Sequence, residues 1–248
     1  MHRFLLLVCS GWLLSLSPVS AAEPIRLCIG DGNPWPPYSY FERTAEGEPD
    51  PSTLDGSATQ QLRQALDQAG LDYQFFFMPW ARVMHEMAAQ QGLCDVVWNV
   101  SYSEQRATFA LFSEVQYHTQ LVLFSMEAST AQHQPSSLAL AEYCGVNGYN
   151  YQPFGLSESE LILGDSIQQV LNMLEAQRCQ FFPSEREPLL SGGELGIYQL
   201  PVGLTYQPLH LTKAFHVMIS RRHPQATTLL ELINHAIATH PLDETLSF

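Results

Sequence analysis

Lysine is almost absent from this 248-residue sequence. Lys213 is the one lysine, and 11 basic side chains face 25 acidic ones, which gives a formal net charge of −14 at pH 7. Nucleic acid and anionic membrane surfaces repel a chain of this charge, so neither is expected as a partner. The acidity instead favours solubility in a compartment outside the cytoplasm.

Long apolar runs are missing after the first residues. An apolar run at residues 4–16 follows a short basic start and precedes small residues at 20–22. It is shorter than the roughly 20 residues that cross a bilayer, and the pattern is typical of a cleaved signal peptide. We therefore predict a signal peptide at residues 1–21 and a periplasmic mature protein without a membrane anchor.

Motifs for catalysis and for cofactor binding are also missing. His85 and Glu86 lack the second histidine of a zinc-protease helix, and Gly30 and Gly32 lack the third glycine of a dinucleotide fingerprint. The sequence has no Gly-x-Ser-x-Gly elbow, no phosphate-binding loop and no Cys-x-x-Cys pair. We therefore expect no metal, no cofactor and no enzymatic activity.

The hydrophobic pattern alternates between strand and helix periods. It predicts strands at 25–30, 72–77 and 94–100, separated by helices that begin at Ser57 and Pro79, with a capping box at Ser57 and Gln60. A weaker copy follows at 143–147, 166–174 and 179–182. Repeated strand–helix units imply parallel strands with right-handed crossovers.

Extended segments at 118–126 and 214–220 connect these two units, and a helix at 224–239 ends the chain. Two such connections are what a hinge between two α/β lobes requires. The predicted division is lobe one at 22–118, lobe two at 119–213 and a return to lobe one at 214–248.

The four cysteines of the mature chain take equivalent places in the two units. In each unit, one cysteine lies in the first strand, and the other lies where the strand after the helix begins. This parallel suggests the disulfides Cys28–Cys94 and Cys144–Cys179, while buried free thiols are the alternative.

Residues 94–106, followed by Phe112, Ser113 and Tyr117, resemble a known pattern. The sequence is similar to the bacterial periplasmic solute-binding proteins of family 3, which serve polar amino acid ABC transporters. Gln116 replaces the proline usual in that pattern. The resemblance covers nearly the whole mature chain and implies a two-lobed, type II periplasmic binding protein fold with each lobe a mostly parallel sheet flanked by helices.

The resemblance assigns two charged residues to the ligand. Arg106 corresponds to the arginine that holds the ligand's α-carboxylate, and Ser103 is placed to cap a short helix in front of it. Glu185 corresponds to the acid that binds the ligand's α-ammonium, although the alignment also permits Glu187. The alternatives are a surface arginine paired with Glu104 and an exposed loop acid.

The remaining site residues are aromatic or neutral polar side chains. Trp35 and Trp80 fall where the family places aromatic rings against the ligand, with ordinary core packing as the alternative. Asn99 and Ser101 follow a predicted parallel strand at its carboxyl end, where α/β sheets bind ligands. Tyr149 and Asn150 match a loop of lobe two, where Tyr149 replaces a smaller Ser or Thr.

The resemblance implies a monomeric periplasmic protein that captures an amino acid or a related compound and delivers it to an ABC transporter permease at the inner membrane. Two alternatives remain: an enzyme of the same fold, similar to cyclohexadienyl dehydratase, and a solute sensor for a membrane receptor.

Overall fold

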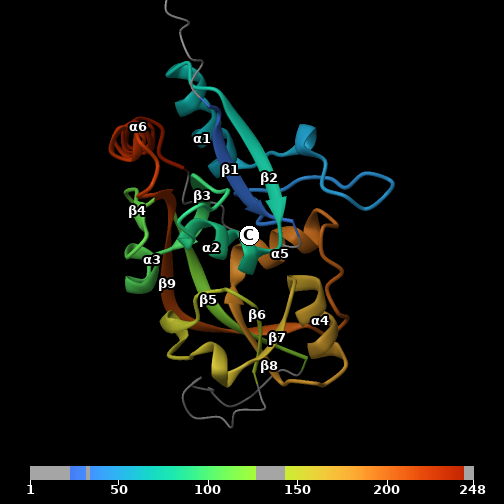
Figure 1. Ribbon diagram of the computed structural model, residues 1–248. Coiled ribbons are helices and arrows are strands. Elements are labelled where there is room, and N and C mark those ends of the chain that lie inside the picture. The colour runs from blue at the N-terminus through green and yellow to red at the C-terminus, as the bar shows by residue number, and fades with distance from the viewer. Residues whose placement is uncertain (1–22, 32–33, 127–142, 243–248) are drawn as a thin grey trace, which may run out of the picture.

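The computed structural model describes residues 23–31, 34–126 and 143–242. The predicted signal peptide at 1–21 lies outside them. No helix in the described residues is both long and apolar enough to cross a membrane. The chain folds into two α/β lobes joined by two strands, which confirms the predicted fold class (Figure 1).

Lobe one contains the first three strands of the chain and the two helical crossovers between them. Its strands are β1 (Ile25–Gly30), β2 (Tyr73–Met78) and β3 (Val96–Ser101), and its first helices are α1 (Ser57–Gln68) and α2 (Trp80–Ala88). β1 pairs in parallel with β2 on one side and β3 on the other. The strands and helices predicted here exist, with ends displaced by only a few residues.

A short second part completes lobe one. The chain forms helix α3 (Glu104–Ala107) and strand β4 (Ala110–Phe112) after β3, and it returns at its end as α6 (Ala226–Thr239). α6 packs against α1, which closes one side of the lobe (Figure 1).

Lobe two is built from β6 (Cys144–Val146), β7 (Ile162–Gly164), α4 (Ile167–Glu175), β8 (Phe181–Glu185) and α5 (Arg186–Glu194). β6 and β7 pair in parallel, and a parallel bridge joins Tyr143 to Phe181 at the start of β8. The buried side of α4 carries Ile167, Val170, Leu171 and Leu174, the apolar side chains that the sequence predicted to share one face.

The connection between the lobes consists of β5 (Tyr117–Ser125) and β9 (Thr205–Ser220). They pair antiparallel, from Tyr117 opposite Phe215 to Ser125 opposite Thr205. β9 also pairs with β3 of lobe one, and β5 also pairs with β8 of lobe two. One sheet with the order β2-β1-β3-β9-β5-β8 therefore passes through both lobes. The lobe limits predicted after residues 118 and 213 fall inside these two strands.

Both suggested disulfides are present. Cys28 in β1 bonds to Cys94, and Cys144 in β6 bonds to Cys179, with Cα–Cα distances of 5.6 and 5.7 Å. In each pair the second cysteine precedes its strand by two residues, because β3 begins at Val96 and β8 begins at Phe181.

Three local predictions were wrong. No capping box forms at Ser57, because Gly56 takes the capping position with φ 111° and no side chain bonds to the first turn. β9 begins nine residues earlier than the predicted strand at 214, since its first half pairs with β5. α5 was not predicted because Pro188, Gly192 and Gly193 weaken its helical pattern.

Candidate functional site

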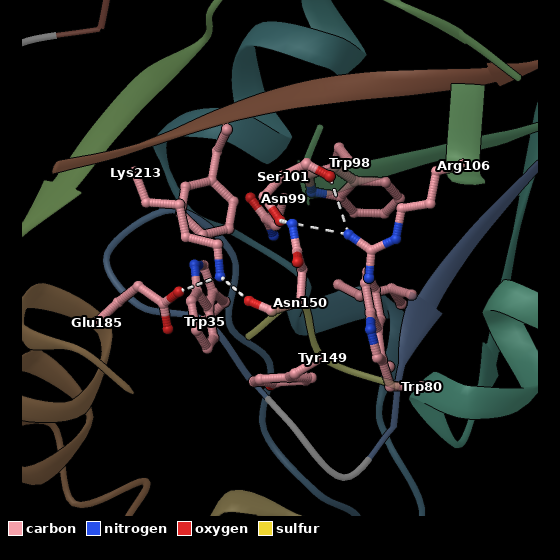
Figure 2. A pocket seen from close by; sticks show the side chains of 13 residues that line it. Trp35, Trp80, Trp98, Asn99, Ser101, Arg106, Tyr149, Asn150, Glu185 and Lys213 are labelled. Atoms are coloured by element: carbon pink, nitrogen blue, oxygen red, sulfur yellow. Dashed lines mark hydrogen bonds and ion pairs between the residues drawn. The ribbon is translucent and has the colours of Figure 1, made fainter. Parts of the chain in front are cut away.

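A cavity lies between the two lobes beside the hinge strands. Thirteen residues line it (Figure 2), and all eight side chains that the sequence singled out are among them. The full set is Ile29, Gly30, Trp35, Trp80, Trp98, Asn99, Ser101, Arg106, Tyr149, Asn150, Glu185, Lys213 and Phe215. The structure therefore brings every predicted site residue to one place.

Arg106 reaches the cavity from the short helix α3. Ser103 caps that helix by accepting a hydrogen bond from the backbone N–H of Arg106, as predicted. Arg106 is only 9% exposed, and its guanidinium donates to the backbone oxygen of Ser101, to Ser101 Oγ and to the backbone oxygen of Gly148. Burial excludes the alternative of a surface arginine paired with Glu104.

The electrostatic surroundings of Arg106 favour an anion. Burial lowers the pKa of Arg106 to about 10, while the charge of Glu158 acts in the opposite direction. Arg106 therefore remains cationic at neutral pH. Its three hydrogen bonds go to neutral oxygens, and no ion pair to it is found among the described residues. A guanidinium has five N–H donors, so two are left over to bind a ligand.

Asn99 and Ser101 lie at the carboxyl end of β3. Asn99 has φ 58°, a left-handed conformation uncommon for residues other than glycine, and it lies where the pairing of β3 with β9 shifts register. The hydroxyl of Tyr117 donates to Asn99 Oδ1 at 2.8 Å. The irregular strand turns this amide and the Ser101 oxygens toward the cavity, as expected for a strained residue at a functional site.

The loop after β6 supplies the contacts from lobe two. The backbone oxygen of Gly148 accepts hydrogen bonds from Trp80 Nε1 at 3.1 Å and from Arg106 at 3.0 Å. Asn150 Nδ2 donates to Ser101 Oγ and to the backbone oxygen of Tyr102. Since Trp80, Ser101, Tyr102 and Arg106 belong to lobe one, these bonds hold the lobes together across the cavity.

Aromatic rings form the remaining walls. Tyr149 lies edge-on to Trp35 and to Trp80, with ring centroids 5.7 and 6.2 Å away. Trp35 also contacts Phe215 of the hinge strand at 5.8 Å. Trp35 Nε1 is buried; burial raises the pKa of the Tyr117 phenol, and hydrogen bonding between Trp35 and Tyr117 acts to lower it. Tyr149 thus occupies the space between the two tryptophans predicted to face the ligand.

Glu185, at the end of β8, meets a residue that the sequence prediction missed. Its Oε1 accepts a hydrogen bond from Lys213 Nζ at 2.6 Å, and Lys213 also donates to the backbone oxygen of Asn150 at 2.9 Å (Figure 2). Glu185 is 2% exposed and Lys213 is 6% exposed. Burial excludes the alternative of Glu185 as an exposed loop acid.

Two features of the sequence could have identified Lys213. It is the one lysine of an acidic chain, and it lies one residue before the strand predicted to return to lobe one. Lysine is rarely fully buried unless it is paired. The alternative acid, Glu187, lies outside the cavity, where it accepts a hydrogen bond from the backbone N–H of Gln120.

The cavity lined by these side chains is small, with a volume of about 40 Å³, and it is partly open to the outside. A wider hollow of about 570 Å³, measured in the same way, adjoins it between α2, α3 and the loop after β6. Arg106, Tyr149 and Asn150 line both spaces. They therefore lie between the small cavity and the wider hollow.

The described residues contain no cluster of three or more His, Cys, Asp or Glu side chains that could hold a metal ion. What the cavity offers is a buried cation, a buried ion pair, several hydrogen-bond donors and aromatic walls. Such a set suits recognition of a small anion with an apolar body.

Comparisons with known proteins agree with this description. Residues 27–247 match the model of the bacterial extracellular solute-binding proteins, family 3. A search of curated proteins finds no match.

Solved structures show the same fold at low sequence identity. The arginine-bound form of truncated ArgBP from T. maritima is 12% identical with a TM-score of 0.67, covering 87% of this chain and 95% of its own. The substrate-binding protein AbpA from Streptococcus pneumoniae, bound to L-arginine, is 15% identical with a TM-score of 0.68, covering 87% and 88%. A histidine kinase sensor domain similar to periplasmic binding proteins is 16% identical with a TM-score of 0.69, covering 87% and 89%.

Proposed function

Because the chain belongs to the bacterial extracellular solute-binding proteins of family 3, we propose that it captures a small carboxylate-bearing solute, an amino acid or a related acid, between its two lobes. The observation that carries this proposal is the buried guanidinium of Arg106, whose partners are all neutral oxygens. A buried cation is costly without a counter-charge, and a carboxylate matches the planar donors of arginine.

The position of Arg106 links binding to closure of the lobes. Its side chain belongs to lobe one and already donates to Gly148 of lobe two, so a ligand bound there contacts both. A ligand that makes more contacts in the closed form than in the open form shifts the equilibrium toward the closed form. Binding in this way would change the shape that the protein presents to its partner.

We propose that the partner is an ABC transporter permease at the inner membrane, and that the protein works as a periplasmic monomer after loss of residues 1–21. The family name and the transport proteins among the similar structures support this role. A second candidate is a solute sensor, because a histidine kinase sensor domain has the same fold. Uptake of a bound ligand that depends on this protein would support transport over sensing.

The first prediction tests the carboxylate site. Mature protein from Ala22 is titrated calorimetrically with a panel of amino acids and carboxylic acids, beside the variant Arg106→Gln. A ligand of the native protein should lose at least tenfold in affinity in this variant, because its carboxylate loses a charged, bidentate partner. The matched control is Arg178→Gln, which removes an exposed arginine and should leave affinity unchanged.

If no carboxylate binds to the native protein, or if Arg106→Gln binds as tightly as the native protein, the proposed function is wrong. Chromatography of the ligand after prolonged incubation separates binding from catalysis. A binding protein returns the ligand unchanged, whereas a dehydratase of the same fold would convert it.

A further inference from the structure

The buried pair of Lys213 and Glu185 limits what the cavity can accept. Lys213 extends from hinge strand β9 and Glu185 from the end of β8, and both point into the cavity beside Trp35 (Figure 2). Their charged atoms are 2.6 Å apart, and both side chains are more than nine-tenths buried. The cavity thus contains a complete ion pair made by the chain itself.

Glu185 therefore has no need of a cation from the ligand. Lys213 neutralises its charge and takes Oε1, and Ser184 Oγ approaches Oε2 at 3.5 Å. A buried carboxylate is stable only when a cation or several donors compensate it. Here the compensation comes from the one lysine of the chain.

Lys213 is in turn held by the groups around it. It donates to the backbone oxygen of Asn150, and its Nζ lies 5.5 Å from the ring centroid of Phe215 and 5.8 Å from that of Phe154. Burial lowers the pKa of Lys213, the pairing with Glu185 raises it, and the positive charge of Arg106 lowers it further. The two cations of the cavity are thus close enough to repel each other.

The balance of charge in the cavity is positive. Arg106 and Lys213 are cationic and Glu185 is anionic, so the lining carries a net positive charge of one, which Glu158 opposes from the adjoining hollow. A ligand with a single negative charge would neutralise it. A zwitterionic amino acid would neutralise Arg106 as well, but its ammonium would enter a cavity that already contains Lys213 and offers no free carboxylate.

We propose that the ligand is a carboxylate anion without an ammonium group, with the Lys213–Glu185 pair excluding α-amino acids. This inference rests on the proposed function and narrows it. The cavity volume of about 40 Å³ favours acids with few non-hydrogen atoms when the lobes are in this arrangement.

The second prediction compares matched acids that differ only by the amino group. Acetate and glycine, propanoate and alanine, and 3-phenylpropanoate and phenylalanine are each titrated into the native protein by calorimetry. In every pair with detectable binding, the amine-free acid should bind at least tenfold more tightly, because the extra ammonium meets Lys213. Tighter or equal binding of the amino acids would overturn the inference while leaving the carboxylate site at Arg106 intact.

Two variants test the role of the ion pair directly. Lys213→Met leaves Glu185 unpaired. The preference of this variant between the two acids of each pair should therefore shift by at least tenfold toward the amino acid. Lys213→Met/Glu185→Gln removes both charges, and with them the repulsion of an ammonium by Lys213, so its preference for the amine-free acid should fall below that of the native protein. An unchanged preference in a folded Lys213→Met variant would contradict the inference. If that single variant does not fold, the native protein and the double variant are compared on the same pairs of acids, and an unchanged preference there would contradict the inference.

Failure of the two proposals would look different. If amino acids bind best and lose affinity in Arg106→Gln, only the exclusion of ammonium is wrong. If neither acids nor amino acids bind to the native protein, the proposed function itself fails.

Discussion

At the scale of single residues, the backbone oxygen of Gly148 has two roles in the contact between the lobes. It accepts from the indole of Trp80 and from the guanidinium of Arg106, both of which belong to lobe one. Gly148 has φ 79°, and a Cβ at this position would lie 3.1 Å from Ala81 Cα. Glycine is therefore required both by the backbone conformation and by the close approach of α2.

The third prediction separates these two requirements. Gly148→Ala should weaken ligand binding at least tenfold, because its methyl group separates Gly148 from α2. The matched control is Gly155→Ala, which has a similar φ of 72° but no atom within 4 Å of the added Cβ. Both variants should lose about 1 kcal/mol of unfolding free energy from the left-handed conformation. Equal affinities of the two variants, measured by calorimetry, would refute the role of Gly148 in closure.

The sequence allowed prediction of residues that line the cavity but not of their partners within the chain. Arg106 and Glu185 were identified because they follow strands of a recognisable pattern. Their partners come from elsewhere: Lys213 is 28 residues from Glu185, and Gly148 is 42 residues from Arg106. Such pairings depend on how the lobes meet, and local periodicity contains no information about that. The expectation that Glu185 meets a ligand ammonium therefore overlooked a lysine that the fold places there.

At the scale of helices and strands, the amphipathic patterns were the most reliable guide. α1, α2, α4 and α6 each bury one apolar face, so their period was visible in the sequence. α5 escaped prediction because its glycines serve packing instead: Gly192 lies directly against the ring of Tyr198. The early half of β9 was missed because its alternate side chains are exposed, which leaves little apolar signal.

The fourth prediction concerns the disulfides that fasten these elements. Each lobe has its own bridge, which closes 66 residues in lobe one and 35 residues in lobe two. Loop-closure entropy gives each bridge roughly 4 kcal/mol of stability, and engineered cases often give less. Cys28→Ala/Cys94→Ala and Cys144→Ala/Cys179→Ala should each lower the unfolding free energy in urea by about 2–4 kcal/mol.

The two effects should be nearly additive, because the bridges share no contacts and lie in different lobes. A native protein that reacts with four equivalents of a thiol reagent before reduction would show that the bridges do not form. The variant Cys144→Ala/Cys179→Ala should also retain the Arg106 site, since neither cysteine lines the cavity.

At the scale of the whole molecule, contacts outside the cavity also join the two lobes. Tyr198, which follows α5 in lobe two, donates a hydrogen bond to the backbone oxygen of Pro34 in lobe one. Tyr198 is buried, and burial raises its pKa far above the ordinary value, so its hydroxyl remains a donor at any physiological pH. This bond joins the two lobes on the side of the cleft where β1 ends.

The fifth prediction uses this contact as a measure of closure. Tyr198→Phe should weaken ligand binding by roughly fivefold, since the net value of one hydrogen bond is about 1 kcal/mol and it forms only between closed lobes. The control is Tyr206→Phe, whose hydroxyl accepts from Arg186 within lobe two. Calorimetric affinity should be unchanged in the control. A similar loss in both variants would mean that Tyr198 acts on folding alone.

The positions of the tryptophans have an optical consequence. Trp35, Trp80 and Trp98 are the tryptophans of the described chain, and all three line the cavity. Indole emission shifts in wavelength and intensity with the polarity and hydrogen bonding of its surroundings, and here each of these rings lies at the proposed binding site. The mature protein therefore has an intrinsic fluorescent reporter of its own occupancy, one that needs no dye and no engineered label.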